Sequence, residues 1–96
     1  MEAVKEIIEE YGIESIGTAE LRINGEARKE YDVFDIDDLG LFADKGLVVA
    51  FLMNDSELLV GELLDVDTDD CRMVLKSDKY TVGYLYNIFQ WFMIVS

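Results

Sequence analysis

LVVAFLMNDSELLVGELLDVDTDDCRMVL, residues 47–75, is the stretch that decides the fold. Apolar runs alternate in it with two short polar segments, 54–56 and 67–70. Runs of this length that are rich in valine and leucine and bounded by turn residues are typical of β-strands. The stretch therefore predicts three consecutive antiparallel strands over residues 47–53, 58–66 and 71–76.

The side-chain patterns of these strands differ. Residues 47–53 are apolar at seven successive positions, which indicates a strand covered on both faces or one in a closed barrel. In the second strand a period of two predicts one face made of Leu58, Val60, Leu64 and Val66 and another made of Leu59, Gly61, Leu63 and Asp65. A glycine in mid-strand, Gly61, favours a sharp bend or a close approach of another backbone. The third strand predicts an inward face of Cys71, Met73 and Leu75.

Two more strands are expected over residues 80–86 and 88–95. The first alternates, with Tyr80, Val82, Tyr84 and Tyr86 on one face, and such aromatic residues on strands are expected mainly in the core. The run from Ile88 to Val95 has no charge and no proline, so at a sheet edge it would promote aggregation. It must lie centrally in the fold or pair with another subunit, and we expect the second arrangement, a homo-oligomer.

Residues 1–45 form an extension. Val4, Ile7, Ile8 and Tyr11 make one apolar stripe that predicts a helix over Glu2–Tyr11, ending at Gly12. A hairpin is expected over 18–36 around Asn24-Gly25. A two-residue turn would oppose Leu21 to Arg28, whereas the preferred three-residue loop, 24–26, gathers on one face Ala19, Leu21, Ile23, Ala27, Tyr31 and Val33. A short helix or turn over 35–45 would pack Leu39, Leu41 and Phe42.

Composition limits the function classes. The chain has 96 residues, expected as a single domain of an extension, 1–45, and a meander, 46–96. Its net charge is −13, which opposes ordinary binding to nucleic-acid phosphates. It has one cysteine, so no intrachain disulfide, and neither a secretory signal nor a membrane-spanning run is expected. We expect a cytoplasmic protein without membrane contact.

The meander resembles the Sm/LSm (Hfq-type) family. The similar residues are Met53-Asn-Asp-Ser-Glu-Leu-Leu-Val-Gly61-Glu-Leu, then Asp67 six positions after Gly61, then Met73-Val-Leu75. Over about residues 47–95, the resemblance implies a strongly bent five-stranded antiparallel sheet, a small barrel preceded by the helix and the additional hairpin. The expected fold class is thus α+β, mainly β. The resemblance also implies a homo-oligomeric ring closed by the last two strands of neighbouring copies.

The chain departs from the family pattern at several positions. Ser56 stands where the family usually has glycine, and the 67–75 segment is one residue longer than is typical. Cys71 or Arg72 falls where an RNA-contacting asparagine is expected, and the corner around Tyr84–Ile88 lacks the basic pair. The family's RNA-contact residues therefore do not carry over to this chain.

Candidate sites for chemistry are few. Asp65, Asp67, Asp69 and Asp70 begin like a calcium loop, but Asp70 and Lys76 occupy the positions that require glycine and glutamate. We interpret the segment as a solvated acidic turn, with Asp65, Asp67 and Asp69 as a weak metal alternative. A second acidic cluster spans 32–38. Without histidine the common triads and histidine-ligated zinc sites are excluded, so we expect no enzyme and no cofactor.

Two functions remain. The first is a non-enzymatic Sm-like homo-oligomer that binds single-stranded nucleic acid weakly through a basic cluster repeated around a ring, Arg72, Lys76 and Lys79. The second is an acidic interaction module or inhibitor that occupies a basic, nucleic-acid-binding site on a partner protein.

Overall fold

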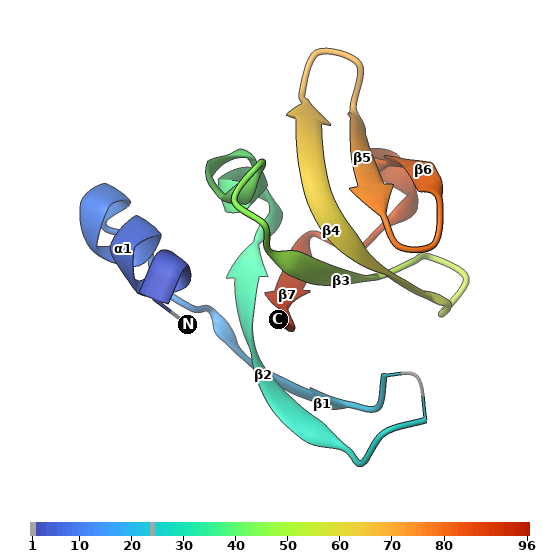
Figure 1. Cartoon of the computed structure of the whole chain (residues 1–96), viewed down its shortest axis with the longest axis horizontal. Coiled ribbons are helices and arrows are strands. Elements are labelled where there is room, and N and C mark those ends of the chain that lie inside the picture. Colours follow the sequence, from blue (N-terminus) through green and yellow to red (C-terminus); the bar gives the residue numbers. More distant parts are fainter. Residues whose placement is uncertain (1, 24) are drawn as a thin grey trace.

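The structure, a computed structural model, describes residues 2–23 and 25–96. The chain is α+β and mainly β, with one N-terminal α-helix and a seven-stranded antiparallel sheet (Figure 1). The strand order is β1-β2-β7-β3-β4-β5-β6. The elements are α1 (Glu2–Tyr11), β1 (Gly17–Leu21), β2 (Lys29–Asp35), the 3-10 helix η1 (Ile36–Phe42), β3 (Val48–Leu52), β4 (Leu58–Asp67), β5 (Arg72–Lys76), β6 (Tyr80–Tyr84), the 3-10 helix η2 (Leu85–Asn87) and β7 (Trp91–Ile94).

The N-terminal hairpin has the register of a three-residue loop. Ala19 pairs with Tyr31 and Leu21 with Lys29, so the same ladder continued to its tip opposes Ile23 to Ala27. The prediction of that register is confirmed, although Asn24, the predicted turn residue, lies outside the described residues. The apolar face expected of the hairpin is half-buried to buried, except that Ala27 is exposed.

The meander β3–β6 follows the predicted order of strands. Gly61 in β4 is buried, and a Cβ built on it would lie 3.1 Å from the Leu75 Cβ and 3.2 Å from the Lys76 carbonyl oxygen of β5. The close backbone approach predicted there is confirmed. The strict alternation predicted for β4 is wrong after Leu63, because a bulge between Leu63 and Asp65 shifts the register and brings Val66 opposite Met73, on the buried face.

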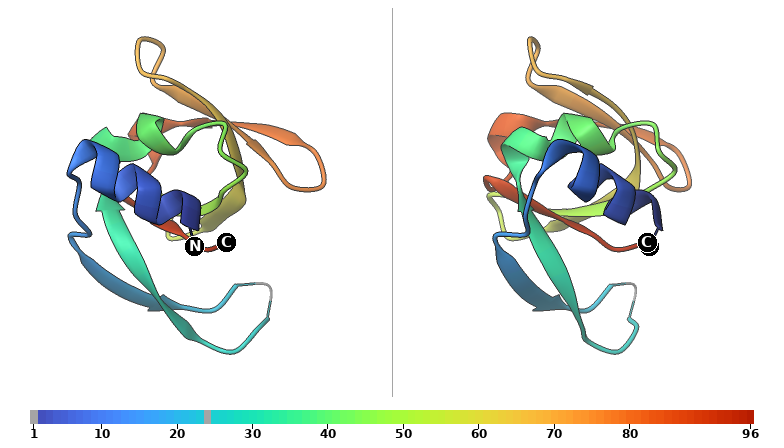
Figure 2. Two further views of the ribbon diagram at one scale, coloured as in Figure 1. Left: turned by 60° about the vertical axis from the view of Figure 1, so that its left-hand side comes forward. Right: turned by 90° about the vertical axis from the view of Figure 1, so that its left-hand side faces the viewer.

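Side chains pack on both faces of the sheet. On the concave face, α1 and η1 cover the sheet (Figure 2). In the main core, Ile7, Leu39 and Phe42 of these helices pack with inward residues of the strands. The helix predicted over Glu2–Tyr11 and the short helix predicted within 35–45 are both confirmed. On the other face, the β1–β2 hairpin folds over a smaller cluster of Val33, Ala50 and Met93. As predicted, β3 is therefore covered on both sides.

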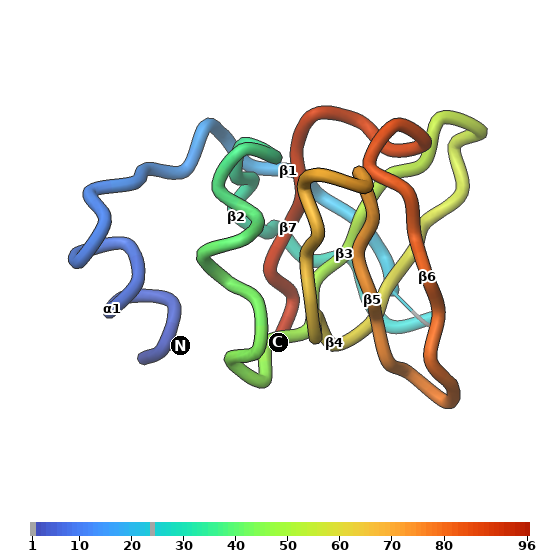
Figure 3. The backbone as a smooth tube through the Cα atoms, turned by 90° about the horizontal axis from the view of Figure 1, so that it is seen from above, coloured from blue at the N-terminus to red at the C-terminus, as the bar shows by residue number. Residues whose placement is uncertain are grey.

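The C-terminal strand β7 lies inside the sheet. It pairs with β2 through Val33 and Met93 and with β3 through Ala50 and Met93. Figure 3 shows β7 between β2 and β3. Its strand conformation covers only Trp91–Ile94, shorter than predicted, while Ile88 forms an isolated bridge with Met53. Since the hairpin of the same chain covers the strand, the need for a neighbouring copy to shield it disappears.

The sheet is open, and β1 and β6 are its edge strands. Five strands, β3–β7, correspond to the predicted meander, and the predicted hairpin continues the same sheet beyond β7. The outer edge of β7, which ring closure by the last two strands would require, is occupied by β2.

Candidate functional site

The outward side chains of β5 and β6 form one exposed surface, here called the β5–β6 surface. Arg72 lies opposite Tyr84, Val74 opposite Val82, and Lys76 opposite Tyr80. The alternate residues Met73, Leu75 and Gly83 point into the core and are buried. A Cβ on Gly83 would lie 2.8 Å from the Met73 Cε, so the Met73 side chain packs directly against this glycine. The sequence therefore fixes which side chains this edge presents to solvent.

Three tyrosines and a valine stand exposed along this edge. The exposed fractions are 67% for Tyr80, 51% for Val82, 42% for Tyr84 and 65% for Tyr86. The Tyr84 and Tyr86 rings stack at 5.4 Å between centroids, with an interplanar angle of 20°. The prediction that they share a face is confirmed for Tyr80, Val82 and Tyr84 of β6. The expectation that such aromatic residues lie mainly in the core is wrong here, because the face that they share is exposed.

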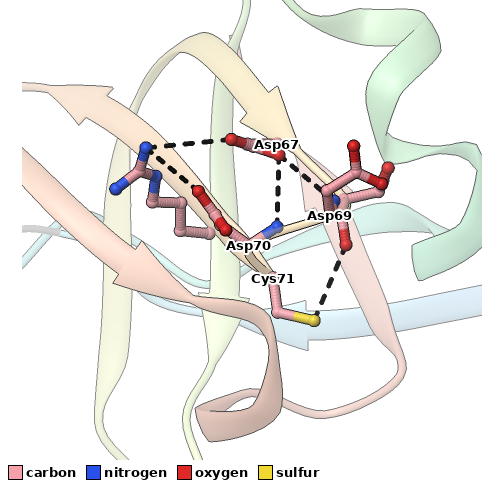
Figure 4. Close-up of polar contacts among 6 residues, drawn as sticks. Asp67, Asp69, Asp70 and Cys71 are labelled. Carbon is pink, nitrogen blue, oxygen red and sulfur yellow. Dashed lines mark hydrogen bonds and ion pairs between the residues drawn. The ribbon is translucent and has the colours of Figure 1, made fainter.

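The three predicted basic residues lie around the same surface but do not form an open cationic patch. The Arg72 Nη2 lies 3.4 Å from the Asp70 Oδ2 and 3.8 Å from the Asp67 Oδ2, as the dashed lines in Figure 4 show. Lys76 pairs in register with Glu62 of β4, and its Nζ lies 5.6 Å from the centroid of the Tyr80 ring. Lys79 is exposed in the β5–β6 turn.

The acidic turn that follows β4 is held by the Asp67 carboxylate. One carboxylate oxygen of Asp67 accepts hydrogen bonds from the N–H groups of Asp69 (3.1 Å) and Asp70 (3.2 Å) (Figure 4). Asp65 lies back along β4, opposite Val74. Among the described residues, no group of three or more histidine, cysteine or acidic side chains is arranged to hold a metal ion, so Asp65, Asp67 and Asp69 are not brought together as ligands.

Cys71 is exposed, and the prediction of an inward thiol is wrong. Its φ is 54°, in the left-handed region, and the ladder of β5 begins only at Arg72. The β4–β5 turn thus takes Cys71 out of the alternation that Met73 and Leu75 follow. Its Sγ lies 3.7 Å from the Thr68 carbonyl oxygen, within the turn.

A hollow of about 360 Å³ adjoins the β5–β6 surface on the side of β4. Two carboxylates, Glu62 and Asp78, line it together with Lys76, beside Val60, Gly61 and Ser77. Another hollow, of about 330 Å³, lies between α1 and β2 and brings Lys5 together with Glu30 and Asp32. Elsewhere, Asp35 of the second acidic cluster caps η1 by accepting the N–H of Asp37 at 2.9 Å.

Comparison of the chain with protein-family models, with curated proteins and with solved structures gave no match. Across residues 2–23 and 25–96, none of the helices has the length and apolar character needed to traverse a bilayer. Arguments about function therefore depend on the β5–β6 surface itself.

Proposed function

We propose that the protein is a non-enzymatic interaction module and that its β5–β6 surface docks a basic segment of a partner protein. The observation that carries the proposal is the row of exposed Tyr80, Val82 and Tyr84 on a free edge strand. Edge strands usually carry charges or proline that prevent association, and tyrosine is enriched where proteins bind one another. A row of rings left on such an edge is suited to an interface.

The charge of the chain indicates that the partner is basic. From Glu62 to Tyr86 the chain carries six carboxylates and three cations, and the whole chain carries −13. Arg72 is held between Asp67 and Asp70, and Lys76 lies over a tyrosine ring, so neither cation is set out for a phosphate. Tyrosine faces and carboxylates together attract lysine and arginine side chains. The long-range field also speeds encounter with a basic protein.

A titration with an oligolysine peptide, followed by the change in tyrosine fluorescence or by calorimetry, tests the proposal. Binding is expected at low salt and should weaken steeply as salt rises, since exposed charges are screened beyond about 10 Å at 0.1 M. Replacing both Tyr80 and Tyr84 by serine should weaken binding about tenfold. The matched control is Tyr11→Ser, which removes another exposed tyrosine, at the end of α1. An absence of oligolysine binding at low salt would contradict the proposal.

Weak binding of single-stranded nucleic acid by an Sm-like fold is the second candidate. Two observations favour it: β7 returns beside β3 to complete a five-stranded unit, and Ser56, at the family's usual glycine position, has a φ of 71°. The stacked Tyr84 and Tyr86 rings also resemble a base-stacking platform. A filter-binding assay with short RNA at low salt decides it. Binding should fall in Arg72→Glu and Lys76→Glu, and no binding would remove this candidate.

The predicted homo-oligomer belongs to that second candidate and needs an interface other than the one the resemblance implied. The outer edge of β7 is paired with β2, so a ring closed by β6 and β7 of neighbouring copies would first have to displace the hairpin. Copies that each carry −13 also repel one another. Sedimentation at micromolar concentration measures the assembly state directly.

A further inference from the structure

We infer that the basic segment of the partner adds to the sheet as an extended strand along the outer edge of β6. This inference rests on the proposed function and specifies how the partner docks. Strand addition supplies affinity through main-chain hydrogen bonds and specificity through alternate side chains. Both components are present at β6.

The free backbone groups of β6 can be assigned from the ladder. The Leu85 N–H donates to the Cys71 carbonyl oxygen at 2.8 Å, and the Ser77 N–H donates to the Lys79 carbonyl oxygen at 3.2 Å. In an antiparallel ladder, pairs joined by hydrogen bonds alternate with pairs that are not. Thr81 and Gly83 therefore bond to β5, which leaves the N–H and C=O groups of Tyr80, Val82 and Tyr84 directed to the open edge.

These residues combine two functions. Their backbone groups face the open edge, and their side chains form the exposed row of the β5–β6 surface. None of the backbone hydrogen bonds found in the described chain joins them to a further segment. The β6 sequence, Tyr-Thr-Val-Gly-Tyr, contains neither proline nor a charged residue, whereas β1 at the opposite edge carries Glu20. Within β6 itself, an added strand thus meets neither proline nor charge.

Charge complementarity identifies the occupant as a lysine- or arginine-rich strand. A second copy would bring another −13, and its β6 carries no cation to meet the rings. The chain's own Lys76 already lies over the Tyr80 ring, so a partner cation has the Tyr84 ring, 42% exposed, as its open aromatic contact. The hollow beside this end of β5 supplies two further carboxylates, Glu62 and Asp78. A cationic side chain entering from the open edge would meet the tyrosine rings first, and behind them the carboxylates of Glu62 and Asp78, which flank Lys76.

The spacing of the two tyrosine rings predicts where cationic side chains lie along the partner strand. Tyr80 and Tyr84 are four residues apart on one strand, which corresponds to about 13 Å. In an added strand, side chains on the same face also recur at every second residue. Cations at alternate positions of the partner would therefore stand beside both rings, and one position between them would meet Val82.

The test uses the whole chain and a synthetic peptide of about ten residues in which lysine alternates with threonine, a length typical of strands. Amide hydrogen exchange followed by NMR should slow about tenfold or more at Tyr80, Val82 and Tyr84 on saturation. Thr81 and Gly83, already bonded to β5, serve as internal controls, and the amides of β1 report on the other edge.

Two N-methylated peptides make the test specific. Methyl groups on the lysine amides block one edge of the peptide strand, and methyl groups on the threonine amides block the other. One isomer should lose binding about tenfold or more while the other keeps it, and which of them loses it reports whether addition is antiparallel or parallel. Equal affinities of the two isomers would overturn strand addition.

The outcomes separate this inference from the proposed function. Salt-sensitive peptide binding without protection of the three β6 amides would leave the interaction module standing and overturn strand addition. Failure of every basic probe to bind at low salt would remove both. Protection of the β6 amides by short RNA, with no effect of the peptide, would assign the surface to nucleic acid and overturn the inference.

Discussion

Replacing Phe92 by leucine tests whether β7 belongs to the core of its own chain. The Phe92 side chain is fully buried, and its ring lies 5.9 Å from Phe34, 5.6 Å from Phe42 and 6.2 Å from Phe51, measured between centroids. These partners come from β2, η1 and β3, so one side chain joins three elements that the strand order brings around β7.

The expected loss of stability follows from these contacts. Truncating a buried phenylalanine to alanine costs about 3–5 kcal/mol, which approaches the roughly 5–14 kcal/mol total for a chain of this size. Leucine keeps most of the apolar volume but removes the ring contacts, each worth about 0.5–1.5 kcal/mol. We therefore expect Phe92→Leu to lower the free energy of unfolding by about 1.5–3 kcal/mol and the melting temperature by roughly 6–24 °C.

Urea unfolding measured at two protein concentrations is the assay. The midpoint of each variant should be the same at both concentrations, because β7 is shielded by β2 and β3 of one chain. Tyr11→Leu, at an exposed ring, is the control and should change stability by less than about 0.5 kcal/mol. A loss below about 0.5 kcal/mol in Phe92→Leu, or a midpoint that rises with concentration, would refute the assignment of β7 to the core of its own chain.

Three further substitutions or modifications probe the meander. Gly61→Ala should cost about 1–3 kcal/mol, since its methyl group would press on β5, whereas Gly40→Ala, with open space around it, should be nearly neutral by urea unfolding. Ser56→Gly should change the free energy of unfolding by less than about 1 kcal/mol, because glycine adopts the left-handed backbone of this position without strain but gives the unfolded chain more conformational entropy. Ser56→Val should lower the free energy of unfolding by more than about 1 kcal/mol, because a β-branched side chain is strained at a positive φ. The Cys71 thiol should react with a thiol reagent in the native protein at nearly its rate in urea, and protection would contradict its exposed position.

Local patterns in the sequence predicted much of the fold. The apolar stripe of Val4, Ile7, Ile8 and Tyr11 predicted α1, although Tyr11 is exposed. Gly12, with a φ of 64°, follows the end of the helix. The loop-length argument at the hairpin predicted its register, since only one pairing brings the apolar residues onto one face. These features depend on residues close together in the chain, where periodicity and turn chemistry are strong signals.

Features that depend on distant pairing were harder to predict. The terminal apolar run fitted either a central strand or a subunit interface, and only the pairing of Val33 with Met93 distinguishes them. The exposure of Tyr80 and Tyr84 was also not predictable, because alternation indicates which residues share a face but not whether another segment covers that face. The bulge after Leu63 and the turn at Cys71 each shift one residue out of the predicted alternation.

The two edges of the sheet explain why the candidate site lies where it does. The N-terminal hairpin continues the sheet beyond β7, so the strand with the greatest tendency to aggregate is enclosed and the sheet ends instead at β1. At the opposite end, β6 keeps open backbone groups and the exposed rings of Tyr80 and Tyr84. The chain thus covers one apolar strand and leaves this row exposed. Under our proposal the association of that edge is selective, because the net charge of −13 would repel further copies and attract a cationic strand.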